Sequence, residues 1–308
     1  MRLLVLGGTK FLGRHAVAHA LEQGHEVTTF TRGQTNPQLF PEVEHLTGDR
    51  DGGLDALRGR AWDGVVDTSG YVPRIVRQSA ELLRDAAHRY VFVSTISVYG
   101  EPDELEDPDT EEIMEHYGAL KRACERVVAD VYGDRGTSVR AGLIVGPHDP
   151  TDRFTYWPRR LAAGGDVLAP ADPQQPVQVI DARDLAAWLV TLAERGPGGV
   201  FDATGPQTTF GDLVERMRGD AELVWVDGQR VLDAGVTPWT ELPLWLPDAD
   251  AWPLMQRDNA GAVAAGLTFR PFDETVRDTR DWDAAEPGER PTLTRAKEAE
   301  ILSGGRGA

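Results

Sequence analysis

Short apolar runs alternate with amphipathic stretches along the first half of the chain, and this alternation constrains the fold more than any other feature. The runs predict parallel strands buried on both faces, and the stretches between them predict helices that cover the sheet. Strands joined in this way require right-handed crossovers. We therefore expect an α/β fold of the Rossmann type with a doubly wound parallel sheet. The expected strands are residues 3–6, 27–31, 43–47, 65–68, 90–94 and 139–145.

Beyond residue 146 the segments become shorter and richer in proline and tryptophan, which indicates a second, smaller domain. A strand at 177–180 and a helix at 184–192 are expected to return to the main sheet. The larger domain is therefore expected to comprise residues 1–148 with about 176–203. The smaller, discontinuous domain is expected at about 149–175 and 204–285, and residues 286–308 are expected to form a polar tail.

The composition argues against several classes of partner and site. The chain has 50 acidic and 32 basic residues, for a net charge of −18, whereas nucleic-acid affinity depends on clustered Lys and Arg. No apolar run approaches the ~18 residues of a membrane span, and Met1 leads directly into an apolar strand without a signal-peptide pattern. We expect a cytoplasmic protein that binds neither nucleic acid nor membrane. Cys124 is the only cysteine, and no metal-ligand spacing is present.

Residues 101–115 contain nine acidic residues in fifteen. The expected structure is a solvated loop. The alternative is an electrostatic gate that disfavours anionic substrates.

A glycine-rich turn lies where the first strand gives way to the first helix. Glycine permits unusual dihedral angles and close backbone approach to a pyrophosphate, and the helix N-terminus offers unpaired N–H groups to the anion. In this context the turn predicts a dinucleotide site, although lysine replaces the usual middle glycine. An ordinary strand-to-helix turn is the alternative. The expected cofactor contacts are Gly7, Gly8, Thr9, Lys10, Phe11, Leu12 and Gly13.

The end of the second strand distinguishes between the two nicotinamide cofactors. NAD sites usually place an acidic residue there, whereas arginine accommodates the 2′-phosphate of NADP. Arg32 follows this strand and no acidic residue occurs before Glu42, so NADP is expected, with Lys10 as a second phosphate contact. The alternative is that Arg32 is an ordinary surface residue. Because ligands bind at the carboxyl ends of parallel strands, further contacts are expected from Asp49, Ser69, Gly70 and Tyr71.

Tyr117 and Lys121 are four residues apart and therefore face the same side of a helix. Lysine is rare here, with only three in the chain. One element earlier, residues 93–100 read Val-Ser-Thr-Ile-Ser-Val-Tyr-Gly and end the fifth strand with a cluster of hydroxyl groups at the same sheet edge.

Together these residues resemble the extended branch of the short-chain dehydrogenase/reductase family, which includes nucleotide-sugar epimerases and dehydratases. The resemblance covers residues 1 to about 285 and includes Gly146-Pro147 and the segment 178–186. The Gly-Gly-x-x-x-x-Gly turn is similar to that of an atypical, isoflavone-reductase-like subgroup.

The resemblance implies a catalytic role for three side chains. Tyr117 would exchange a proton with the substrate oxygen while a hydride moves to or from the nicotinamide. Lys121 would lower the pKa of this tyrosine, which is about 10 in free tyrosine, and would bind the nicotinamide ribose. Thr95 would orient the substrate carbonyl, with Ser94 and Ser97 as weaker candidates. The family also implies a monomer or a homodimer.

The sequence departs from the sugar dehydratases directly after the threonine. Ile96 and Ser97 stand where those enzymes carry Asp-Glu, so the acid and base of elimination are missing. We therefore expect an NADP(H)-dependent oxidoreductase that reduces a carbonyl or oxidises a secondary alcohol on a small molecule. One alternative is an epimerase of nucleotide sugars that retains NAD, and another is a non-catalytic RNA-binding member of the family.

Candidate substrate contacts are Ser97, Arg153, Tyr156 and Trp157. An aromatic lining would suit a hydrophobic or ring-bearing substrate. The alternative is that these aromatic residues form the core of the smaller domain.

Overall fold

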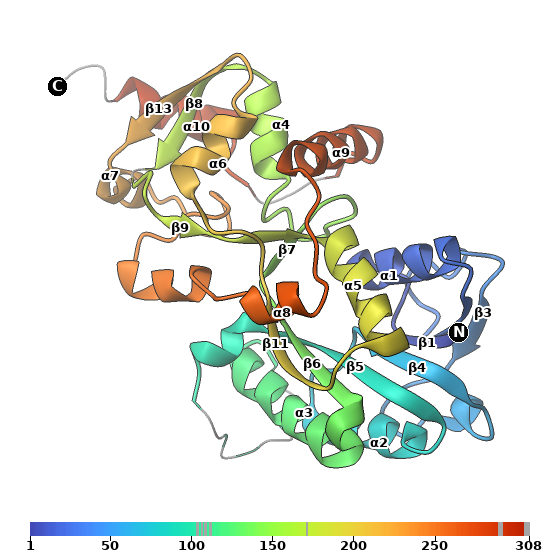
Figure 1. The fold of residues 1–308 in the computed structure, drawn as a ribbon. Coiled ribbons are helices and arrows are strands. Elements are labelled where there is room, and N and C mark those ends of the chain that lie inside the picture. The colour runs from blue at the N-terminus through green and yellow to red at the C-terminus, as the bar shows by residue number, and fades with distance from the viewer. Residues whose placement is uncertain are drawn as a thin grey trace. The chain divides into compact units, whose positions relative to one another are not determined.

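Seven strands form one parallel sheet in the computed structural model, in the order β11-β6-β5-β4-β1-β2-β3 (Figure 1). All neighbouring strands are parallel. The strand order reverses between β1 and β4, which confirms the doubly wound α/β fold and marks the switch point where such sheets bind ligands. The strands are β1 (Arg2–Leu6), β2 (Glu26–Thr31), β3 (Glu44–Thr47), β4 (Trp62–Asp67), β5 (Ala87–Thr95), β6 (Gly136–Ala141) and β11 (Gly199–Ala203). The structure describes residues 1–102, 105, 107, 110, 113–170, 172–288 and 292–304.

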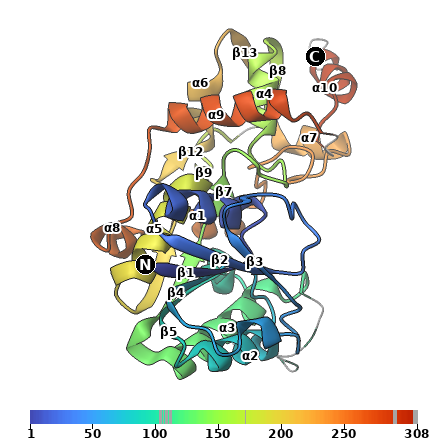
Figure 2. The ribbon, with the colours of Figure 1, turned by 90° about the vertical axis from the view of Figure 1, so that its right-hand side faces the viewer.

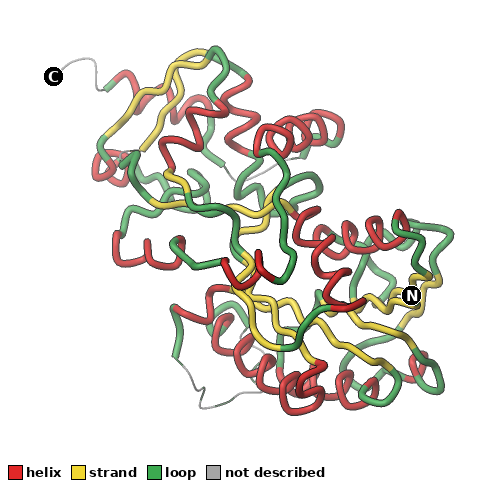
Figure 3. The backbone as a smooth tube through the Cα atoms, in the orientation of Figure 1, coloured by secondary structure: helices red, strands yellow, loops and turns green. Residues whose placement is uncertain are grey.

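Helices cover both faces of this sheet, as Figures 2 and 3 show. One layer contains α1 and α5, and the other contains α2 and α3. Alternate strand residues point to opposite faces, so Leu4 and Leu6 belong to the core under α2 and α3, while Leu3 and Val5 are buried on the other side. These helices are α1 (Phe11–Glu22), α2 (Pro73–Leu83), α3 (Tyr117–Tyr132) and α5 (Ala182–Arg195), with the 3-10 helices η1 (Asp55–Leu57), η2 (Ile96–Tyr99) and η3 (Gly133–Arg135).

The expectation that residues 177–180 belong to the main sheet is wrong. Those residues contribute to two short strands, of which β9 (Pro176–Val177) pairs with β12 (Thr208–Thr209). The strand that joins the sheet is β11, which pairs with β6. It is an edge strand with an exposed Val200 and a polar Asp202, so it lacks the continuous apolar run by which buried parallel strands are detected.

The chain divides into two units. Unit 1 comprises Met1–Ile144, Ala182–Gly205 and Arg257–Phe269, and unit 2 comprises Val145–Asp181, Pro206–Gln256 and Arg270–Ala308. Unlike the expected division, residues 145–148 and 176–181 belong to unit 2, and residues 204–205 and 257–269 belong to unit 1. Helix α8 (Ala260–Ala264) lies in unit 1, and β7 (Leu143–Val145) spans the boundary.

Unit 2 is organised around the parallel pair of β8 and β13. The stretch 286–308, expected to be a polar tail, contains helix α10, whose buried Glu298 accepts hydrogen bonds from Arg160 at 3.0 and 2.8 Å. No helix among the described residues is long and apolar enough to cross a membrane. The elements of this unit are α4 (Tyr156–Ala162), β8 (Gly165–Pro170), β10 (Val179–Asp181), α6 (Phe210–Met217), β13 (Ala221–Val226), α7 (Gly228–Asp233), η4 (Ala249–Met255), α9 (Phe272–Ala285) and α10 (Arg295–Ser303), with β9 and β12.

Candidate active site

The glycine turn after β1 has the geometry of an anion-binding loop. Gly7 and Gly8 have φ angles of +108° and +105°, which favour glycine. A Cβ on Gly13 would lie 2.7 Å from the Gly8 nitrogen, so a side chain there would displace the turn. In the described part of the chain no side chain caps the first turn of α1, which begins at Phe11. This cradle and its amide N–H groups fit the pyrophosphate of a dinucleotide.

Two cations lie at this end of the sheet. Arg32 directly follows β2 and Lys10 precedes α1, and both side chains are exposed. The Asn36 side-chain amide donates to the Thr9 carbonyl at 3.0 Å, so the loop after β2 is held against the glycine turn. Within the described ranges neither cation has a hydrogen-bond or ion-pair partner, which leaves both for a ligand.

Asp49 follows β3, at a position where the sequence predicts a cofactor contact. Its side chain is exposed, and its Oδ1 accepts from the Asp51 N–H at 2.9 Å. The neighbouring Arg50, which the sequence did not single out, turns inward. Arg50 Nη1 and Nη2 contact the two carboxylate oxygens of Asp67 at 2.7 and 2.8 Å, in a buried bidentate pair.

The three residues predicted after β4 lie beside this ion pair. Ser69 Oγ donates to the Leu6 carbonyl at 3.1 Å. The Gly70 carbonyl accepts from Lys121 Nζ at 2.7 Å. Tyr71 remains 42 % exposed, and its ring centroid is 6.3 Å from that of Tyr117. The structure thus brings the segment after β4 together with the Tyr117–Lys121 pair.

Lys121 is the most constrained of the predicted catalytic residues. Only 3 % of it is exposed, and Nζ donates to the carbonyls of Gly70 and of Val93 in β5, the latter at 2.5 Å. Burial lowers the pKa of Lys121 to about 8, while the negative charge of Asp67 opposes that shift. The ammonium therefore lies at the carboxyl ends of β4 and β5, beside the switch point.

Thr95 ends β5 and Tyr117 begins α3. The Thr95 hydroxyl accepts from the Ser97 N–H and donates to Ser97 Oγ, both at 3.1 Å. Glu101 lies at the start of the acidic segment and accepts from the N–H groups of Gly118 and Ala119 at 2.7 and 3.1 Å. A carboxylate stabilises the N-terminus of a helix, so Glu101 fixes the turn that carries Tyr117. Residues 103, 104, 106, 108, 109, 111 and 112 of that segment lie outside the described residues, and the proposed electrostatic gate falls largely on them.

Gly118 permits the close approach of η2 to the first turn of α3, because a Cβ at this position would collide with the Ser97 carbonyl. We expect Gly118→Ala to lower the free energy of unfolding by about 1–2 kcal/mol, since overpacking outweighs the gain in helix propensity. Gly261→Ala in α8 is the matched control, because its Cβ would make only an ordinary contact, 3.8 Å from Phe201. Urea unfolding of both variants measures the difference, and equal stability of the two would contradict the packing argument.

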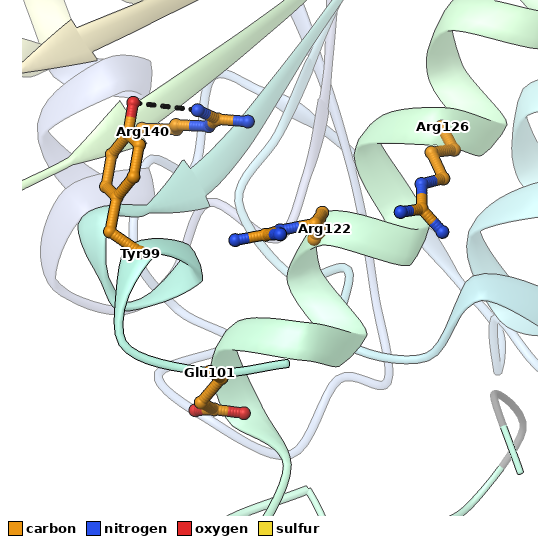
Figure 4. Close-up of a pocket in the computed structure, with 5 residues that line it drawn as sticks. All are labelled: Tyr99, Glu101, Arg122, Arg126 and Arg140. Carbon is orange, nitrogen blue, oxygen red and sulfur yellow. Dashed lines mark hydrogen bonds between the residues drawn. The ribbon is translucent and has the colours of Figure 1, made fainter. Parts of the chain in front are cut away.

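A pocket beside α3 is lined by Tyr99, Glu101, Arg122, Arg126 and Arg140 (Figure 4). None of the predicted catalytic residues lines it. Arg140 pairs with Glu125 at 2.7 Å and donates to the Tyr99 hydroxyl at 2.7 Å, while Arg122 donates to the Val98 carbonyl. These contacts connect η2, α3 and β6, so Arg122 and Arg140 have structural roles here.

The predicted substrate residues of unit 2 differ in exposure. Arg153 is exposed. Tyr156 and Trp157 are buried, and the indole N–H of Trp157 donates to the Pro243 carbonyl at 2.7 Å. The burial of Tyr156 and Trp157 agrees with the alternative interpretation, in which these residues form the core of the smaller domain.

Comparison with known proteins identifies the family. Residues 3–70 and 72–203 match the model of the NAD dependent epimerase/dehydratase family. The chain belongs to this family. The resemblance to the extended short-chain dehydrogenases/reductases is thereby confirmed. The chain is a member of a family of NAD(P)-dependent enzymes of oxidoreductase type, and it has the NAD(P)-binding Rossmann fold of that family.

The known proteins that resemble this chain in sequence or in structure have different named activities. The chain is 28 % identical to a chloroplast stem-loop binding protein of 41 kDa from Arabidopsis thaliana over 70 % of its own length and 61 % of that protein. It is 28 % identical to dTDP-4-dehydrorhamnose reductase from Streptomyces griseus, over 66 % of this chain and 70 % of the reductase. A similar solved structure is Bordetella bronchiseptica WbmG in complex with NAD and UDP, with a TM-score of 0.64 and 19 % identity, covering 93 % of this chain and 96 % of WbmG.

Proposed function

We propose that the protein is an NADP(H)-dependent oxidoreductase that reduces a carbonyl or oxidises a secondary alcohol on a small molecule. The observation that carries the proposal is the buried ammonium of Lys121, held by the Gly70 and Val93 carbonyls one helical turn from Tyr117. Burying a cation is costly, and this cost is understandable where the charge serves a reaction at the switch point.

The proposed chemistry assigns one task to each side chain. Tyr117 exchanges a proton with the substrate oxygen, and Lys121 favours the ionised tyrosine by its positive charge. Thr95 orients the substrate oxygen by a hydrogen bond, for which its hydroxyl must exchange its contact with Ser97. When bound, the nicotinamide supplies or accepts the hydride. The glycine turn, Asp49, Ser69, Gly70 and Tyr71 would hold the cofactor.

The relatives named as reductases support a net redox reaction. The test is to incubate the purified protein with NADPH or NADH and a panel of carbonyl compounds that includes aromatic ketones and nucleotide-linked keto-sugars. Oxidation of the reduced cofactor in step with loss of one carbonyl compound supports the proposal. Interconversion of nucleotide sugars with NAD retained would instead indicate an epimerase, in line with the solved epimerases of similar fold. Salt-sensitive retention of RNA without turnover would indicate the non-catalytic alternative.

Arg32 is proposed to set the preference for NADP(H). We expect Arg32→Asp to lower the ratio of kcat/KM for NADPH to that for NADH by roughly 10- to 100-fold, because one charge-assisted contact with the 2′-phosphate contributes about 1.5–3 kcal/mol. Arg58→Asp, which changes an exposed arginine paired with Asp55, is the matched control. An unchanged ratio in Arg32→Asp would reject this assignment.

A further inference from the structure

We infer that the buried pair of Arg50 and Asp67 positions Lys121, acting through the turn at Ser69 and Gly70. The inference concerns a second layer of residues beneath the proposed catalytic site, and its relevance to turnover rests on the proposed function. Neither Arg50 nor Asp67 is assigned a contact with cofactor or substrate. Both are therefore positioning residues.

The pair is buried and joined by several hydrogen bonds. The side chain of Asp67 is 0 % exposed and that of Arg50 is 11 % exposed. Arg50 Nη2 also donates to Ser79 Oγ at 2.7 Å, and the Tyr90 hydroxyl donates to Asp67 Oδ2 at 2.6 Å. Replacing a buried ion pair by apolar residues is often neutral or stabilising. Stability alone is therefore a weak reason for a buried ion pair at this position. A positioning role for the pair is the alternative reason.

The pair holds the turn that follows β4. Asp67 Oδ1 accepts from the Ser69 N–H at 3.1 Å, and Arg50 Nη1 donates to Ser69 Oγ at 3.3 Å. Gly70 is enclosed by packing as well, because a Cβ on it would lie 2.7 Å from Phe92 and Val76 atoms. The turn is therefore fixed by hydrogen bonds on one residue and by packing on the next.

The same turn provides an acceptor for Lys121, whose Nζ donates to the Gly70 carbonyl at 2.7 Å. A continuous path of contacts thus runs from Arg50 through Asp67 and Ser69 to Gly70 and Lys121. A displacement of the turn would move this acceptor and with it the ammonium. Misplacement of a reacting group by about 1 Å can cost on the order of a hundredfold in rate.

The pair also contributes to the electrostatic environment of Lys121. The charged and titratable groups that act on the ammonium are Asp67 from β4, Arg50 from the loop after β3, and Glu125 and Cys124 from α3. The Tyr71 ring centroid lies 5.1 Å from Nζ, and the Tyr117 ring lies beside that of Tyr71. Asp67 favours the charged lysine and Arg50 disfavours it. Changes to the pair should therefore be visible in the titration of Lys121 itself.

The scarcity of lysine makes this titration measurable without any assay of turnover. Protein labelled with carbon-13 at lysine Cε has three lysine signals, from Lys10, Lys121 and Lys297. The Lys121→Met variant assigns the signal of interest. In the wild type it is expected to titrate near pH 8, the pKa given by burial.

Two variants change the contacts of Asp67 in opposite electrostatic directions. Asp67→Asn removes the negative charge and is expected to move the Lys121 titration about one pH unit lower. Tyr90→Phe removes a donor to Asp67, leaves the carboxylate less neutralised, and is expected to move the titration upward. Tyr132→Phe is the matched control, because Tyr132 packs against Tyr90 with ring centroids 5.0 Å apart while its buried hydroxyl has no partner among the described residues.

The expected results are opposite shifts for Asp67→Asn and Tyr90→Phe, no shift for Tyr132→Phe, and a fall in kcat of up to about a hundredfold for Asp67→Asn. If Asp67→Asn does not fold, Tyr90→Phe against Tyr132→Phe decides the matter alone. An unshifted Lys121 signal in folded Tyr90→Phe, or an equal shift in Tyr132→Phe, would overturn the inference. Shifts as expected in a protein that turns over no carbonyl substrate would uphold the positioning of Lys121 and reject the proposed function.

Discussion

Replacing Tyr117 by phenylalanine is expected to lower kcat of the proposed reaction by about 10²- to 10⁴-fold, the usual contribution of a general acid or base. The change removes only the phenolic oxygen. The ring contact with Tyr71 would persist, with centroids 6.3 Å apart, and so would the Glu101 cap on the first turn of α3. The dissociation constant of the cofactor should therefore change little.

The measurement combines initial rates, followed through the absorbance of the reduced cofactor, with cofactor binding by calorimetry. Tyr132→Phe is the matched control, because Tyr132 is the last residue of the same helix. It is expected to retain the wild-type kcat. Full activity in Tyr117→Phe would show that another group transfers the proton and would reject the proposed mechanism. Loss of cofactor binding in parallel with kcat would instead assign Tyr117 to binding.

The features that sequence alone predicted are those that local patterns encode. The first five strands of the sheet follow from apolar runs, and the glycine turn follows from residue type at a strand end. The pairing of Tyr117 with Lys121 follows from helical spacing. Each of these patterns lies within one strand, turn or helix and its immediate neighbours. The structure contains the strands and helices that these patterns predict.

The features that sequence missed depend on contacts between distant residues. Arg50 and Asp67 are 17 residues apart, and nothing in the spacing shows that an arginine after β3 turns inward to a carboxylate at the end of β4. Asp67 directly follows the buried Val65 and Val66, and an acidic residue at the end of such an apolar run is a signal in the sequence. The acidic pattern places Glu101 in a solvated loop, yet its carboxylate caps α3. A charge count cannot identify which of nine acidic residues meets a helix end.

Aromatic content was equally ambiguous in unit 2. The sequence does not show whether a tryptophan lines a pocket or belongs to the core, because that depends on its packing in the folded protein. Trp157 is fully buried, and its ring stacks edge-on against Phe210 at 5.2 Å between centroids. The hydrophobic character predicted for the substrate therefore has no support from this residue.

Replacing Lys121 by methionine is expected to change both activity and the pH dependence of stability. The apolar stem is retained and the ammonium is lost, so kcat should fall by at least about 10²-fold, because the charge that favours ionised Tyr117 is absent. The effect on stability follows from the same burial. Lys121 titrates near pH 8 in the folded protein and near pH 10.4 in the unfolded chain.

The direction of the stability effect follows from proton counting. Between pH 8 and about 10.4 the unfolded state holds a proton on this lysine that the folded state has released, so stability rises with pH. Below pH 8 both states are protonated, and the full penalty for the buried charge is present. As pH rises through this window, the wild type should gain about 3 kcal/mol relative to Lys121→Met.

Urea unfolding of both proteins at several pH values from 7 to about 10.5 measures this difference, and the subtraction removes titrations that the two proteins share. Lys10→Met, which removes an exposed lysine, serves as the control for the loss of a lysine side chain and is measured over the same pH range. A constant difference for Lys121→Met would mean that the folded protein does not depress the pKa of Lys121. In that case, favourable interactions would offset the cost of burying the Lys121 ammonium. The contacts at the carboxyl ends of β4 and β5 do not account for such an offset.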